Sequence, residues 1–188
     1  MDLYVAIFQG IIIASTPLVL AAIGELIVEK SGVLNLGVEG MMIIGAVASF
    51  IVTHETGSHL MGILAAIIAS GLIAVIFGIL TQYLLSNQVA TGLALTLFGL
   101  GLASLIGQSY SGISLKAFPI LEVTILSDIP IIGGMLFSFD YLVYLSVLIV
   151  VATYLFLKKT KAGLILIATG DNHDSAHSLG YSVKKIRL

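Results

Sequence analysis

A short polar segment between two long apolar runs carries the side chains best able to contact a solute. It reads Glu29-Lys30-Ser31-Gly32-Val33-Leu34-Asn35-Leu36-Gly37-Val38-Glu39-Gly40. If this segment is helical, Asn35 and Glu39 are four residues apart and share one face. An amide and a carboxylate are costly in lipid, so we expect both to face the interior of a helix bundle. This pattern predicts the polar lining of a transport pathway, although the spacing fits equally well an ordinary cytoplasmic turn followed by a helix start.

Glycines and a second polar break extend this predicted pathway. Glycine permits turns and the close approach of another backbone, and Gly37 and Gly40 flank Glu39. A tight polar break, Ser86-Asn87-Gln88, separates two later apolar runs. The predicted pathway residues are therefore Asn35, Glu39, Gly37, Gly40, Asn87 and Gln88.

Other chemistry is poorly supported by the sequence. His173 and His177 would share a helical face beside Asp174, but no fourth metal ligand is recognisable. The chain has no cysteine, which excludes disulfides and thiolate chemistry. It also lacks a P-loop, a Ser/His/Asp pattern and a zinc-protease pattern. We therefore expect no catalytic residue, no metal, no cofactor and no nucleic-acid partner.

Composition places these residues in a membrane protein. Apolar residues make up 59% of the chain and charged residues 10%, and the mean hydropathy is +1.15. Soluble domains are about 45–50% apolar and about 25% charged. The first apolar run is full length and lacks a basic leader, so no cleavable signal peptide is expected. We predict an all-α, polytopic transmembrane helix bundle with about five spans plus a cytoplasmic coupling helix.

Five apolar segments approach the roughly 20 residues that cross a bilayer. We expect them at about residues 3–26, 33–53, 60–85, 88–107 and 139–157. Pro17 predicts a kink in the first of them. A longer connection, residues 108–138, contains Pro119 and Pro130. This divides the chain into a transmembrane part, residues 1–157, and a polar tail, residues 158–188, in which a further helix starts.

Small residues follow the third and fourth predicted spans. They let membrane helices approach closely, which indicates a packed bundle. Gly99 and Gly101 in the fourth span would also suit a passage, but packing is the favoured interpretation.

The distribution of basic residues predicts the orientation. Seven of the eight Lys and Arg residues fall on one side if the tail is cytoplasmic, and Lys116 is the exception. By the positive-inside rule, the tail and the breaks near residues 30 and 87 are then cytoplasmic. The N-terminus and the connections at residues 54–59 and 108–138 are expected outside.

The tail contains residues that typically start and end a short helix. Asn172 or Asp171 suits its N-cap, and Gly180 suits the left-handed position after its end. Ser182 is then expected to cap a further helix that begins at Val183. Such an element would dock a soluble partner; the alternative is an amphipathic loop that rests on lipid headgroups.

These motifs together resemble a known family. Residues 29–42, ending in Gly40-Met41-Met42, resemble the signature of permease subunits of bacterial ABC importers, the superfamily of the ribose and branched-chain amino-acid permeases. The form SGVLNLGVEGMM, followed by Asn87-Gln88-Val89-Ala90-Thr91-Gly92, is similar to the nucleoside (basic membrane protein type) branch. The tail from Thr160 to Val183 is similar to the cytoplasmic coupling loop of that family.

The resemblance implies a partner set and a coupling site. It implies a permease in the bacterial cell membrane that pairs with a second permease, as a homodimer or heterodimer. ABC ATP-binding subunits would dock inside, and a substrate-binding protein or lipoprotein would deliver a nucleoside or sugar-like solute outside. The coupling residues would be Asn172, Asp174, Ala176, Leu179 and Gly180, with Ala176 and Leu179 as the apolar contacts on one helical face.

The chain departs from the family pattern in two respects. Residues 164–168 contain no basic residue, and His177 stands where a small residue is usual. Family members also continue with several more spans, so we expect this chain to be a fragment or a truncated product. The alternatives are a permease for an amino acid or another small solute, an autonomous secondary transporter with Glu39 as its protonatable group, and a membrane scaffold.

The orientation is testable in this cysteine-free chain. Single cysteines at Ser58 and Ser175 should react with a membrane-impermeant thiol reagent from opposite sides, because the predicted topology puts them on opposite faces. Labelling in intact and in opened cells measures this. Reaction of both from the same side would contradict the orientation.

Overall fold

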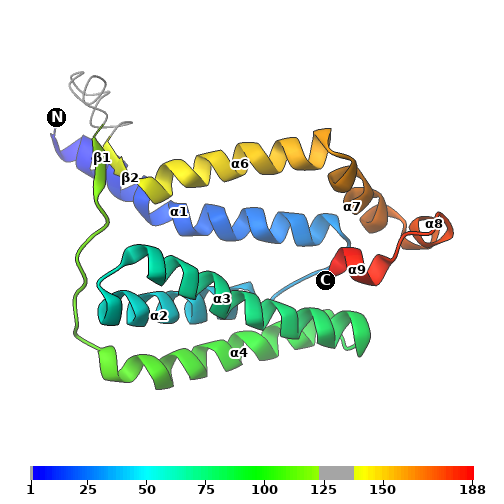
Figure 1. Cartoon of the computed structure of the whole chain (residues 1–188), viewed down its shortest axis with the longest axis horizontal. Coiled ribbons are helices and arrows are strands. Elements are labelled where there is room, and N and C mark those ends of the chain that lie inside the picture. The colour runs from blue at the N-terminus through cyan, green and yellow to red at the C-terminus, as the bar shows by residue number, and fades with distance from the viewer. Residues whose placement is uncertain (1, 123–137) are drawn as a thin grey trace. The chain divides into compact units, whose positions relative to one another are not determined.

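Long membrane-type helices dominate the computed structural model, which describes residues 2–122 and 138–188 (Figure 1). The long elements are α1 (Asp2–Lys30), α2 (Val38–Thr56), α3 (His59–Gly78), α4 (Gln88–Gly107) and α6 (Tyr141–Lys159). The short ones are the π-helical turn η1 (Ile79–Tyr83), the 3₁₀ turn η2 (Gln108–Tyr110), β1 (Ile120–Glu122), β2 (Ser138–Asp140), α7 (Lys161–Asp171), α8 (His173–Ser178) and α9 (Val183–Arg187). Five helices within the described residues are long and apolar enough to span a membrane. The predicted polytopic, all-α fold class is confirmed.

The chain forms two compact units. One contains residues 1–24 and 117–160, and the other contains residues 25–116 and 161–188. The proposed division at residue 157 between spans and coupling loop concerns function and stays a prediction. The part of the long connection that contains Pro130 lies outside the described residues.

In the first unit, a short antiparallel pair of strands leads into α6. Strand β1 pairs with β2 in the register Ile120↔Asp140. The side chain of Asp140 then caps α6, because its Oδ1 accepts hydrogen bonds from the backbone N of Leu142 at 2.9 Å and of Val143 at 3.2 Å. The side chain of Asp140 therefore fixes the N-terminal end of this span.

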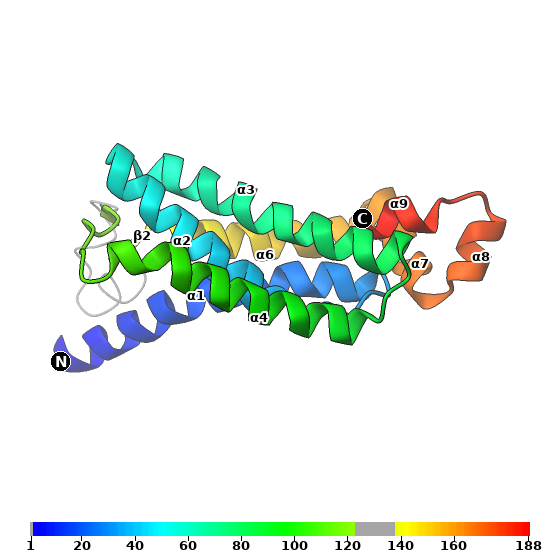
Figure 2. The same cartoon turned by 90° about the horizontal axis from the view of Figure 1, so that it is seen from below.

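The second unit is built on α2, which packs against both α3 and α4 (Figures 1 and 2). Its buried apolar cluster consists of Val33, Met41, Ile73, Phe77 and Leu95. Most other large apolar side chains on α3 and α4 are exposed, and those on α2 are partly exposed. That distribution is typical of membrane helices, whose outer surfaces contact lipid or other subunits.

Glycine contacts set the distance between these helices. A Cβ atom on Gly40 would lie 2.6 Å from the carbonyl oxygen of Leu95, and one on Gly99 would lie 2.7 Å from the Cα of Gly40. Between α2 and α3, a Cβ on Gly62 would meet Thr53 Oγ1. The packing role predicted for the small residues is confirmed at Gly99.

The helix boundaries differ from expectation at the turn between the first two spans. Helix α1 continues to Lys30, and α2 begins only at Val38. The second span was expected from about residue 33, but residues 33–37 lie outside any helix. Helix α7 was not anticipated, and α3 ends in a π-helical turn, a feature often found at functional sites.

The α2–α4 contact predicts a strong effect of one added methyl group. Gly40→Ala should lower the stability of the bundle by about 1–3 kcal/mol, because the new Cβ overlaps the α4 backbone. Gly101→Ala is the matched control, since a Cβ there meets nothing within 4 Å in the described structure. Thermal unfolding in detergent measures the difference, and equal melting temperatures would contradict the close contact.

Candidate functional site

The segment between α1 and α2, residues 31–37, is the candidate site. Helix α1 ends in a Schellman motif: the backbone N of Gly32 donates to Glu29 O at 2.9 Å, and that of Val33 donates to Val28 O at 3.3 Å. Gly32 has φ +83°, a left-handed conformation that favours glycine. The chain therefore leaves the helix sharply at Gly32 and runs without helical hydrogen bonds until α2 begins.

Distant side chains bind the exposed backbone of this loop. The N–H of Leu34 donates to Gln88 Oε1 at 2.8 Å, and the N–H of Asn35 donates to Glu25 Oε1 at 3.0 Å. Glu25 belongs to the last turns of α1, and Gln88 is the first residue of α4. An unpaired N–H in an apolar environment would cost several kcal/mol, so these two side chains stabilise the non-helical conformation of the loop.

Asn35 and Thr96 complete the set from inside the bundle. The side chain of Asn35, which is 7% exposed, accepts a hydrogen bond from the backbone N of Gly37 at 2.9 Å. Its amide nitrogen lies 3.6 Å from the sulfur of Met41. Thr96 of α4 donates its hydroxyl hydrogen to Leu36 O at 2.9 Å. Asn35 thus holds the turn into α2, and Thr96 joins that turn to α4.

The loop rests directly on the backbone of α4. A Cβ on Gly92 would lie 2.8 Å from the backbone N of Leu36 and 2.9 Å from that of Gly37. A Cβ on Gly37 would lie 3.3 Å from Gly92 O. No side chain fits between the two segments, which explains why glycine occupies both positions.

The structure brings four of the six predicted pathway residues together. Asn35, Gly37, Gly40 and Gln88 all belong to this junction of the loop, α2 and α4. Asn87 instead caps α4, and its Oδ1 accepts from the backbone N of Ala90 at 3.0 Å. Contact of these residues with a solute stays a prediction.

One expectation about Glu39 is wrong, and the other stays a prediction. Asn35 and Glu39 do not share a helical face, because Asn35 precedes the helix that contains Glu39. The shared face required residues 35–39 to be helical, and residues 33–37 are not. Glu39 is exposed on the second unit, so the helices of that unit do not enclose it, and its place in an assembled bundle stays a prediction.

The sequence did not identify Glu25 or Thr96 as residues of this site. Glu25 is an acidic residue near the end of a long apolar run, and such a residue requires a partner in lipid. The sequence thus indicates that Glu25 needs a hydrogen-bond partner. It does not identify the partner, which is the backbone N–H of Asn35, ten residues later.

The C-terminal segment has the predicted helix-capping residues. Asn172 Oδ1 accepts from the backbone N of Ser175 at 2.9 Å and caps α8, and Gly180 has φ +86°. Both assignments are confirmed. Helix α9 starts at Val183 as expected, but the side chain of Ser182 forms no capping bond.

The two predicted docking residues of α8 differ in exposure but line one groove. Ala176 is 5% exposed, whereas Leu179 is 77% exposed. Both line a groove of about 400 Å³ between α7 and α8, together with Leu164 and Ala168. Docking of a partner on these residues stays a prediction.

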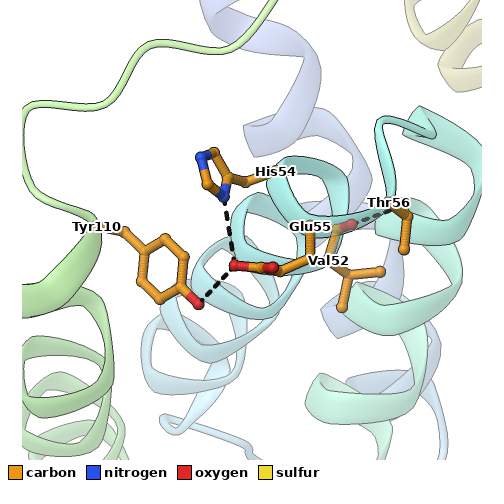
Figure 3. A network of polar contacts seen from close by, with 5 residues as sticks. All are labelled: Val52, His54, Glu55, Thr56 and Tyr110. Carbon is orange, nitrogen blue, oxygen red and sulfur yellow. Dashed lines mark hydrogen bonds and ion pairs between the residues drawn. The ribbon is translucent and has the colours of Figure 1, made fainter.

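A polar cluster joins α2 and η2 at the other end of the second unit (Figure 3). Glu55 Oε1 accepts a hydrogen bond from the hydroxyl of Tyr110 at 3.1 Å and lies 3.4 Å from His54 Nδ1. The rings of His54 and Tyr110 meet edge to face, with centroids 5.6 Å apart. Because Glu55 is largely exposed, we assign this cluster a modest role in holding the ends of α2 and α4 together.

Residues 7–188 match the protein family described as "Branched-chain amino acid transport system / permease component". The chain belongs to this family. Its members are membrane components of transport systems, and the chain is accordingly a multi-pass permease-type protein and not an enzyme.

Three curated relatives are ABC permeases by name. The chain is 39% identical over 178 residues to a putative glucose ABC transporter permease protein, TsgC13, from Haloferax volcanii, covering 93% of this chain and 54% of the relative. It is 30% identical to the guanosine permease protein NupQ of Bacillus subtilis, covering 96% and 60%. It is 28% identical to the nucleoside permease protein NupC of Lactococcus lactis, covering 96% and 61%.

The chain thus spans between 54% and 61% of the length of these relatives. No solved structure matches it.

The geometry predicts different effects for Asn35 in the loop and for Glu39 in the first turn of α2. Asn35→Ala should destabilise the protein by about 1–3 kcal/mol, because the N–H of Gly37 loses its buried acceptor. Glu39→Ala is the matched control and should leave stability nearly unchanged, since the side chain is exposed. Thermal unfolding and hydrogen exchange of the Gly37 amide measure both, and equal destabilisation would contradict the assigned role of Asn35.

Proposed function

We propose that the chain is a permease subunit of an ABC importer and forms part of the translocation path for a nucleoside or sugar-like solute. The observation that carries this proposal is the family match over residues 7–188, which includes both the 31–37 loop and the α7–α9 segment. The names of the relatives support the solute class, because they specify glucose, guanosine and nucleosides. A neutral, polar solute also agrees with the scarcity of charged residues in the spans.

The permease would supply a path and a lever, while a separate ATPase supplies the energy. Helices α2 and α4 are joined by backbone-to-backbone glycine contacts, so they would tilt together. A rigid-body tilt of this kind changes which side of the membrane a central path opens to. Asn35 and Gln88, at the junction of these helices, are the proposed polar groups nearest that path.

The proposed partners follow from this arrangement. An ATP-binding subunit would contact the α7–α9 segment on the cytoplasmic side, and a second permease would complete the path. A substrate-binding protein or lipoprotein would deliver the solute on the outer side, where the N-terminus also lies in the proposed orientation. The exposed apolar side chain of Leu179 supports ATPase docking at α8, because exposed apolar anchors typically dominate interface energies.

A branched-chain amino acid is the second candidate solute, because the family description names that class. Substrate-stimulated ATP hydrolysis by the reconstituted complex distinguishes the candidates. We expect stimulation by a nucleoside or a sugar and none by leucine. Stimulation by leucine alone would overturn the proposed solute class.

The docking proposal predicts that one substitution uncouples the complex. Leu179→Asp should abolish co-purification of the ATPase and solute-stimulated hydrolysis, because it places a charge in an apolar contact. Ser182→Asp is the matched control: it adds the same charge nearby, at an N-cap position that aspartate suits. Pull-down from detergent extracts with normal expression of both variants measures the effect. Normal ATPase association of Leu179→Asp would show that docking occurs elsewhere.

A further inference from the structure

Helix α9 lies against two places where the membrane helices have irregular backbone. Arg187 donates a hydrogen bond from Nε to the carbonyl oxygen of Ser31 at 2.9 Å, at the sharp exit from α1. Lys184 Nζ lies 5.6 Å from the ring centroid of Tyr83, in the π-helical turn. A Cβ on Gly78 would lie 2.7 Å from the side chain of Leu188. Helix α9 and Leu188 therefore contact the chain where α1 ends and where α3 ends.

The end of α7 makes a second contact with the same loop. Gly170 packs so closely that a Cβ there would overlap Lys30 O and would lie 3.0 Å from the backbone N of Gly32. A Cβ on Gly32 would in turn lie 2.7 Å from the guanidinium of Arg187. The backbones touch with no flexible side chain between them. A displacement of α7 would therefore push directly on the backbone at the end of α1.

The α7–α9 segment is also coherent within itself. Helix α7 packs against both α8 and α9, and α8 packs against α9. The buried side chain of Ala176 anchors α8 in this arrangement. Figures 1 and 2 both place the segment at the end of the α2–α4 bundle where α3 ends and α4 begins. A force on exposed Leu179 would thus move the segment as one body.

We propose that Arg187 and Gly170 are positioning residues that transmit movement of α8 to the 31–37 loop. The inference rests on the proposed function and adds the route of coupling. The loop is bound to α4 through Gln88 and Thr96, so it passes the displacement on to the α2–α4 pair. Arg187 suits this role because a charged donor forms a strong hydrogen bond to the Ser31 carbonyl, which has left the helical ladder.

The test uses Arg187→Ala in the assembled, reconstituted transporter, with Lys185→Ala as the matched control. Lys185 is exposed on the same helix, so its loss removes the same charge without breaking the contact. Arg187→Ala should retain ATPase association and the KM for solute, but lose several-fold in solute transported per ATP hydrolysed. Lys185→Ala should keep the wild-type ratio. A purely structural contribution of Arg187 would lower expression or both activities together and would not change this ratio.

Hydrogen exchange provides a second readout that needs neither partner nor solute. Amides of residues 34–37 should exchange faster in Arg187→Ala than in Lys185→Ala, because the loop loses one of its supports. Equal exchange, or an equal transport-to-hydrolysis ratio, would overturn the inference.

Absence of solute-stimulated hydrolysis in the wild-type complex would instead reject the proposed function. Gly170→Ala, compared with Gly71→Ala where a Cβ meets nothing within 4 Å, probes the second contact by the same two measurements.

Discussion

The structure depends on hydrogen-bond partners for the backbone N–H and C=O groups of residues 33–37. These residues lie next to apolar spans but outside any helix, so they lack helical hydrogen bonds. In lipid or a dry bundle, each unpaired N–H or C=O group costs several kcal/mol. Gln88, Glu25 and Thr96 supply the missing partners from α4 and α1. Within the described residues, no buried side-chain nitrogen or oxygen lacks a hydrogen-bond partner. The polar residues of this region are thus first of all structural, and any contact with solute is made by groups already committed to the loop.

The close packing around the loop follows from the same constraint. Side chains of α4 reach the backbone of residues 34–36 only if the two segments touch, and they touch because Gly37 and Gly92 face each other. Gly40 and Gly99 continue the contact along α2 and α4. Membrane helices gain little from hydrophobic burial against each other, so such close van der Waals contact and hydrogen bonding stabilise the bundle. The same contacts make the junction of α2 and α4 rigid, as the proposed joint tilting of the two helices requires.

The sequence predicted those features that depend on composition and local chemistry. Five spans follow from hydropathy, and the caps at Asn172 and Gly180 follow from the preferences of amides and glycine at helix ends. The failures are non-local. The length of the apolar run suggested a span from about residue 33, whereas α2 starts only at Val38, and Glu25, Gln88 and Thr96 bind the non-helical backbone before it. The burial of Ala176 depends on α7, whose helical character was not foreseen.

The predicted site residues also show this difference between local chemistry and assumed helical geometry. Asn35 was selected as a costly polar residue in an apolar setting, and its burial agrees with that physical argument. Glu39 was selected by the same argument and by its spacing from Asn35, and the spacing argument failed because the helix begins at Val38, after Asn35. An exposed carboxylate one turn from a buried junction would still be costly in lipid. Within an assembled transporter it would therefore need protein, water or a second permease beside it, which agrees with the proposed pairing of two permeases.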